Sequence, residues 1–148
     1  MFLNQYHRIY LNYHKRLLVL QKMNEQLYYF LYGNYLLREI NLPSVRMIQD
    51  FFLARNECLN KVKLPNVEEI GHGFLKCNYG LRVLELPKVV KISADFLENN
   101  IDFRELSIPK CKSLGSGFLR RNERIRFLNL SSVLHLEFPV NAKLKKKG

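Results

Sequence analysis

Apolar residues recur along most of this chain with a fixed spacing of 22 residues. The phrase Phe-Leu-x-x-Asn occurs five times without insertion or deletion, at 30–34, 52–56, 74–78, 96–100 and 118–122. A second phrase, Leu-Pro-x-Val, keeps the same spacing from Leu42, Leu64 and Leu86, and continues in altered form from Ile108 and Leu130. Such unbroken self-similarity predicts a solenoid, in which each repeat packs on the next and buries a continuous core.

One segment of each repeat has the alternation of a strand. In the third copy Leu84 and Leu86 lie two residues apart, so both side chains point to the same side of a short strand. A proline follows four of the five segments and ends the strand, because it has no N–H to donate. The residues expected to point outward from these strands are Glu39/Asn41, Lys61/Lys63, Val83/Glu85, Glu105/Ser107 and Phe127/Asn129.

A second segment of each repeat has the spacing of a short helix. From Ile70 to Leu75 apolar residues occur at positions i, i+4 and i+5, which predicts one or two helical turns. Tight turns, some with positive φ, are expected at the glycines that fall in alternate copies, Gly71, Gly73, Gly115 and Gly117. The periodic asparagine can donate to and accept from backbone groups that regular structure does not reach, so we expect a ladder of amides.

The combined phrase from Ile70 to Val89 resembles the leucine-rich repeat, in particular the bacterial BspA-type subtype with the pattern IGxxAFxxC/NxxLxxIxIPxxV. The resemblance covers about residues 27–138. It implies an α/β solenoid with a curved parallel sheet on one face and short helices or 3-10 turns on the other. It also implies function by binding proteins or cell surfaces, and it makes a role like that of a bacterial virulence effector a hypothesis.

The ends of the chain are less regular. Residues 1–26 are either a degenerate repeat, in which Leu18 takes the place of Ile40, or an amphipathic cap helix. Residues 27–138 form the solenoid, and residues 139–148 are a basic tail expected to be disordered. No capping segment follows the last repeat, and two explanations are open. The chain is a fragment of a longer protein, or the edge of its last strand contacts a partner or a second copy.

Composition narrows the class of protein. The 148 residues include 24 Lys and Arg against 13 Asp and Glu, a net charge of +11. No apolar run of about 18 residues is present, which excludes a transmembrane span, and the first residues lack the compact apolar core of a signal peptide. These features predict a protein that is cytoplasmic in the producing cell, with export by a route that needs no cleaved leader as the alternative. Three cysteines at irregular spacing argue against a disulfide framework.

Catalytic and metal-binding patterns are sparse. The four histidines are scattered, and none lies within a short metal-ligand spacing of a cysteine. Cys111 takes the place of an apolar core residue, whereas Cys58 and Cys77 take variable, solvent-facing positions. Because no nucleophile or phosphate-loop motif is present either, we expect no enzyme activity, no catalytic residue, no cofactor and no metal site.

Function is therefore expected at the variable positions. An arginine recurs just before the strand in four of five copies, at Arg38, Arg82, Arg104 and Arg126, with Asn60 in the other copy. The candidate protein-binding residues are Arg38, Lys61, Lys63, Arg82, Val83, Glu85, Arg104, Glu105, Arg126, Phe127 and Asn129. Phe127 is the strongest candidate for a hot spot, and the expected partner is a protein with an acidic surface.

Two other readings of these charges stay open. The arginines could be paired with neighbouring Glu39, Glu85 and Glu105 and bind no partner. Residues 104–148 also hold eleven basic against three acidic side chains, which makes nucleic acid or an anionic membrane the alternative partner.

Overall fold

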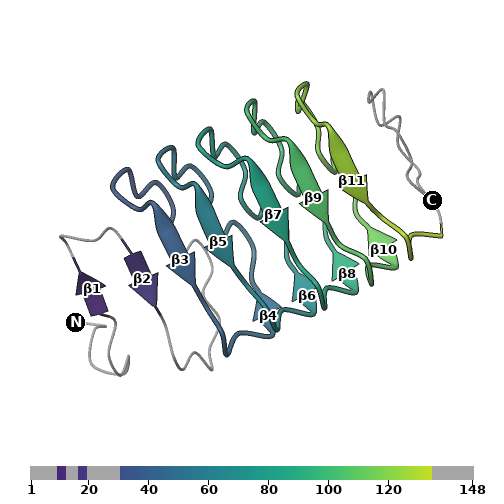
Figure 1. Ribbon diagram of the computed structural model, residues 1–148, viewed down its shortest axis with the longest axis horizontal. Coiled ribbons are helices and arrows are strands. Elements are labelled where there is room, and N and C mark those ends of the chain that lie inside the picture. The colour runs from purple at the N-terminus through teal and green to yellow at the C-terminus, as the bar shows by residue number, and fades with distance from the viewer. Residues whose placement is uncertain (1–9, 13–16, 20–30, 135–148) are drawn as a thin grey trace.

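Each 22-residue repeat folds as one turn, or rung, of a parallel β-solenoid (Figure 1). The computed structural model describes residues 10–12, 17–19 and 31–134. Successive rungs stack so that equivalent residues lie side by side. Two sheets and a third side made of turns enclose the core, and every inter-rung strand pair among residues 31–134 is parallel.

The first sheet holds the strands predicted from the alternating segments. Its strands are β3 (Glu39–Asn41), β5 (Lys61–Lys63), β7 (Val83–Glu85), β9 (Glu105–Ser107) and β11 (Phe127–Asn129). β3 pairs with β5, and β7 pairs with β9 and β9 with β11, each with a register shift of 22 residues. β7 lies beside β5, so the two hydrogen-bonded groups form one continuous layer (Figure 1).

The second sheet is formed by two-residue strands. They are β4 (Met47–Ile48), β6 (Glu69–Ile70), β8 (Lys91–Ile92) and β10 (Ser113–Leu114), which pair in parallel in this order. Each strand turns one residue outward and one toward the core, as Lys91 is exposed and Ile92 is buried. This sheet begins the segment for which the apolar spacing predicts a helix.

The predicted short helices are wrong. None of the described residues forms a helix, and so none of them belongs to a helix long and apolar enough to cross a membrane. Along the third side of the solenoid the sign of φ instead alternates from one residue to the next. It is positive at every second residue, with values of 56°, 57° and 58° at Phe51, Leu53 and Arg55. A right-handed helix needs negative φ at every residue, so this alternation excludes it. The backbone N–H groups bond across rungs, as from Arg55 to the carbonyl of Lys76 at 2.8 Å.

The N-terminal segment contributes two strands to the first sheet. β1 (Tyr10–Asn12) pairs antiparallel with β2 (Leu17–Val19), and β2 pairs in parallel with β3. Leu18 lies opposite Ile40, a shift of 22 residues that continues the register of the solenoid. The remaining residues of the 1–26 segment and the whole tail 139–148 lie outside the described residues.

Aromatic and aliphatic ladders fill the core. Four phenylalanines stack from rung to rung with ring centroids 6.3, 6.0 and 5.6 Å apart, in the order Phe52, Phe74, Phe96 and Phe118. Leucine and isoleucine columns from both sheets are buried beside them. Cys111 is fully buried among these residues, which confirms its predicted place in the core.

The predicted asparagine ladder is confirmed. The side-chain oxygen of Asn78 accepts the backbone N–H of Asn56 at 3.1 Å, and Asn100 accepts that of Asn78 at 3.2 Å. The Asn78 amide nitrogen donates to the carbonyl of Leu53 at 2.9 Å. Asn56, Asn78 and Asn100 are fully buried, so their amides satisfy backbone groups that water does not reach.

Candidate protein-interaction surface

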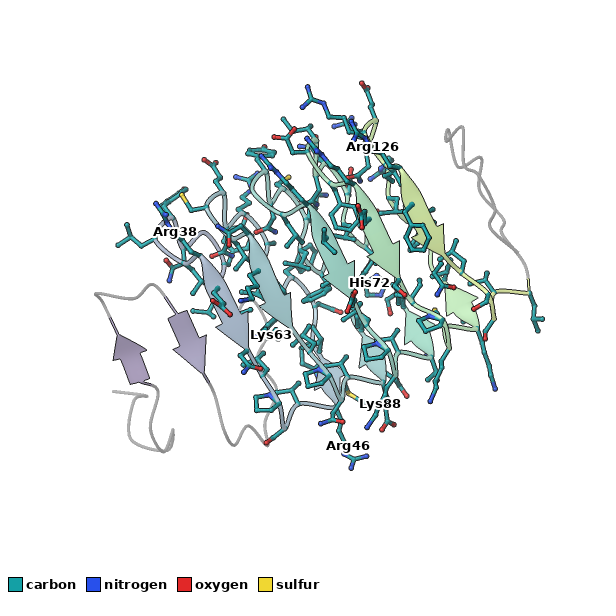
Figure 2. All side chains as sticks on the ribbon, in the orientation of Figure 1. Arg38, Arg46, Lys63, His72, Lys88 and Arg126 are labelled. Atoms are coloured by element: carbon teal, nitrogen blue, oxygen red, sulfur yellow. The ribbon has the colours of Figure 1, made fainter. Side chains whose placement is uncertain are left out.

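The outward side chains of the first sheet form a broad surface, which we call the strand face. Within each strand the central residue is inward, as Leu84 is 1% exposed, while its neighbours Val83 and Glu85 are exposed. The strand register brings Val83, Glu105 and Phe127 next to one another on successive rungs. The alternation of burial therefore places the predicted strand residues on one side of the sheet. Lys63 is the one of them labelled in Figure 2.

Both apolar candidates on this face are accessible. Val83 is 46% exposed and Phe127 is 40% exposed. Asn129 is half-buried and donates to the hydroxyl of Ser107 at 3.3 Å, so part of its hydrogen-bonding capacity is already used. The polar residues Lys61, Lys63 and Glu85 are exposed around them.

The four arginines before the strands form a second feature, the arginine column: Arg38, Arg82, Arg104 and Arg126. Hydrogen bonds between rungs fix its backbone. The carbonyl of Arg104 accepts the N–H groups of Arg126 and Phe127 at 2.8 and 3.1 Å, and that of Arg82 accepts from Arg104 and Glu105. Arg104 is half-buried between its neighbours, whereas the other three are exposed. Figure 2 labels the first and last of the column, which precede β3 and β11.

The acidic neighbours of the column do not neutralise it. Glu39 pairs with lysines of the next strand, with Lys61 at 3.1 Å and Lys63 at 4.0 Å. No arginine of the column forms an ion pair with any residue in the described part of the chain. The expectation of pairing with Glu39, Glu85 and Glu105 is therefore not met within that part. Like charges held one rung apart repel, and this favours an anionic partner.

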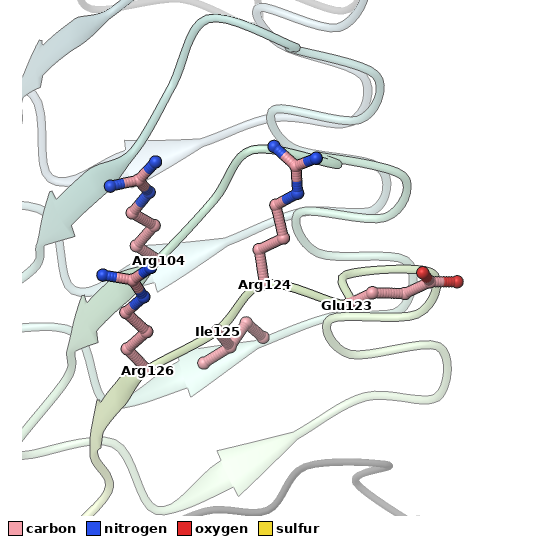
Figure 3. Close-up of a pocket in the computed structure, with 5 residues that line it drawn as sticks. All are labelled: Arg104, Glu123, Arg124, Ile125 and Arg126. Carbon is pink, nitrogen blue, oxygen red and sulfur yellow. The ribbon is translucent and has the colours of Figure 1, made fainter.

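A shallow pocket lies at the C-terminal end of the column. It measures about 380 Å³ and is lined by Arg104, Glu123, Arg124, Ile125 and Arg126. Figure 3 shows the side chains of Arg104 and Arg126 extending side by side in the same direction, and that of Glu123 extending away from them. Arg124 is bound to the carboxylate of Asp102 on the preceding rung. Sequence reasoning named the charges here but not the hollow, because its shape depends on the turn that follows Asn122.

A charged cluster on the turn side was not predicted. The Glu98 carboxylate, only 5% exposed, contacts Lys76 and Arg120 at 2.7 Å each, and Arg120 also contacts Asp95 at 3.3 Å. Burial alone would raise the pKa of Glu98, but the bonds and charges of Lys76 and Arg120 outweigh it and lower that pKa. The 22-residue spacing of Lys76, Glu98 and Arg120 could have revealed this cluster. All its charges are compensated, so its role is structural.

The described residues contain few reactive groups. No three His, Cys, Asp or Glu side chains within residues 10–12, 17–19 and 31–134 gather in a way that could hold a metal ion. Burial raises the pKa of the Cys111 thiol and suppresses its reactivity, while Cys58 is exposed and Cys77 half-buried. His72 is exposed. Comparison of the chain with protein families, curated proteins and solved structures gives no match. Function therefore has to be inferred from the solenoid and its surface.

Proposed function

We propose that this chain is a non-enzymatic protein–protein interaction module that binds another protein through the strand face and the arginine column. The observation that carries the proposal is the difference in burial between the inward and outward residues of each strand. Inward residues are buried in the core, while the outward ones, Val83 and Phe127 among them, take no part in it. Exposed apolar side chains beside arginines are typical of the centre of protein interfaces.

The dimensions of the strand face suit such a contact. Parallel strands lie about 4.8 Å apart, so the six strands β2, β3, β5, β7, β9 and β11 span about 25 Å. The three-residue strands are about 10 Å long, so a standard contact of roughly 800 Å² per partner extends beyond them onto the arginine column. The side of the solenoid made of turns carries internally paired charges at Lys76, Glu98 and Arg120, so it supports binding less well.

The finer assignment is to the leucine-rich-repeat kind. Its support is the 22-residue period and the asparagine ladder, both features of that class of solenoid. The role of a bacterial effector follows only from the resemblance of the repeat phrase and stays a prediction. The third side of each rung, which is made of turns, is a departure from the helical return that the resemblance implied.

Capture of partners by the immobilised protein tests the proposal. The triple variant Arg82→Ala, Arg104→Ala, Phe127→Ala removes two charges and an exposed aromatic ring from the strand face and the arginine column, and we expect it to lose the captured protein. Circular dichroism and thermal unfolding must show that the variant is folded. The matched control, Lys88→Ala with Lys110→Ala and Val90→Ala, removes two charges and an exposed apolar side chain away from the strand face, and should retain the partner.

The alternative is binding of nucleic acid through the basic C-terminal region. Phosphate binding weakens steeply with added salt, whereas a contact centred on Phe127 should not. If retention on DNA or heparin were the sole activity, and vanished on deletion of residues 143–147, the interaction-module proposal would be wrong.

A further inference from the structure

We propose that Arg104 and Arg126 bind a carboxylate of an acidic polypeptide segment, whose neighbouring apolar side chain packs on Phe127. This inference rests on the proposed function and specifies the partner's chemistry at one end of the strand face. It assigns a ligand class to the pocket between the last two rungs.

The first support is the pair of guanidinium groups themselves. Arg104 and Arg126 occupy the same position on adjacent rungs, about 4.8 Å apart along the solenoid. Their side chains extend in the same direction (Figure 3), and neither has an ion-pair partner in the described part of the chain. A carboxylate has two oxygens and can accept from both groups, which replaces their mutual repulsion by attraction.

The second support is that the pair is held in place before any ligand arrives. The carbonyl of Arg104 accepts two backbone N–H groups from the next rung, including that of Arg126 itself. Arg104 is half-buried, which limits the conformations of its side chain. Binding therefore costs little additional side-chain and backbone entropy at these two arginines, and this favours affinity.

The other charges of the pocket do not compete for the ligand. Arg124 is already neutralised by Asp102, and the side chain of Glu123 extends away from the arginine pair (Figure 3). Ile125 packs against the core and supplies an apolar floor. The uncompensated positive charge of the pocket is thus concentrated on Arg104 and Arg126.

The surroundings favour a polypeptide over a nucleic acid. Glu85 and Glu105 are exposed on the same face and would repel a continuous phosphate backbone. Bases can stack on Phe127, but Glu105 lies beside it on the neighbouring strand and repels the phosphates that accompany them. An acidic peptide can place a carboxylate on the arginines and a leucine or aromatic side chain on Phe127, and so satisfies both features.

The experiment measures fluorescence anisotropy of a labelled peptide of about eight residues, long enough when extended to cross the face. The peptide contains glutamate and leucine in equal number. We expect the intact protein to bind it, and the variant Arg104→Ala, Arg126→Ala to bind about ten-fold to a hundred-fold more weakly, as loss of charge-assisted hydrogen bonds implies. Phe127→Ala should weaken binding as well.

The matched control is Lys110→Ala with Lys112→Ala. These exposed lysines lie on the segment that connects β9 to β10, away from the strand face. Their loss lowers the net charge by two, as the loss of the two arginines does. This control should bind the peptide as the intact protein does. The variant Arg104→Lys, Arg126→Lys keeps the charge and the fold but not the forked donors, and we expect it to bind several-fold more weakly.

Three results of the peptide experiment would overturn the proposal. They are failure of the intact protein to bind the peptide, equal weakening in the lysine control, and binding of single-stranded DNA or phosphatidylserine vesicles but not of the peptide. Failure of the proposed function is separate. If a captured protein were lost on Phe127→Ala but retained by the Arg104→Ala, Arg126→Ala variant, the interaction module would stand and the carboxylate site would fall.

Discussion

The buried asparagines join each rung to the next through bonds that no backbone group replaces. Asn78 accepts from the backbone of Asn56 on one side and donates to the carbonyl of Leu53, 25 residues earlier. Since both partners are backbone groups shut off from water, the amide acts at once as a turn residue and as a tie between rungs.

Replacing Asn78 by alanine should therefore be costly. Two buried backbone groups lose their partners, at about 1–3 kcal/mol each, so we expect the free energy of unfolding to fall by about 2–5 kcal/mol. Urea denaturation followed by circular dichroism measures this. Asn60→Ala is the control, because Asn60 is exposed on the same solenoid and should cost less than about 0.5 kcal/mol. Equal losses in the two variants would refute the role of the ladder.

Glu98 should make stability depend on acid. Its pKa in the folded protein lies below the ordinary 4.5, so the unfolded chain binds the proton more readily. The stabilisation by Glu98 is thus complete above about pH 4.5 and is lost as the pH falls through the folded pKa. Glu98→Gln should flatten the acid limb of a plot of unfolding free energy against pH. Glu57→Gln, an exposed control, should leave that limb unchanged.

At the scale of elements, the strands of the first sheet follow directly from sequence because their burial alternates residue by residue. The third side does not, because apolar residues at i, i+4 and i+5 are compatible with more than one backbone path. Gly73 and Gly117 hint at left-handed φ, at 62° and 71°. Leu53 and Leu75, however, adopt φ of 57° and 56° without glycine, and only stacking against neighbouring rungs imposes that conformation.

Gly73 tests how tightly this third side is packed. A Cβ there would lie 2.7 Å from the ring of Phe51 on the preceding rung, in addition to the strain of φ +62°. Gly33 has a similar φ of +67° but nothing within 4 Å of its Cβ position. We expect Gly33→Ala to lower the free energy of unfolding by about 1 kcal/mol, and Gly73→Ala by about 2–3 kcal/mol. Thermal and urea unfolding would show the difference, and equal losses would mean that Phe51 shifts without cost.

At the scale of the whole molecule, the strand face could be predicted because it consists of the strand residues that the repeating apolar pattern leaves outside the core. Once the inward residues are assigned, the outward ones follow from the strand period. The pairing of charges on that face could not be predicted, because Glu39 pairs with both lysines of the neighbouring strand β5 and not with Arg38, its neighbour in the sequence. Which partner a long charged side chain contacts depends on its rotamer, and the sequence pattern does not determine that rotamer.

Local stability should vary along the solenoid, since each rung contacts only its neighbours. The core residues of the central rung, Leu84 and Leu86, are at most 1% exposed, whereas their equivalents Leu128 and Leu130 are only partly buried. Amides of β7 should therefore exchange with deuterium about ten-fold or more slowly than those of β11. Hydrogen exchange followed by mass spectrometry measures both strands in one sample, at a concentration low enough to exclude contact between copies. Equal protection at that concentration would contradict the prediction, whereas protection of β11 that appears only at higher concentration would indicate a second copy on its outer edge.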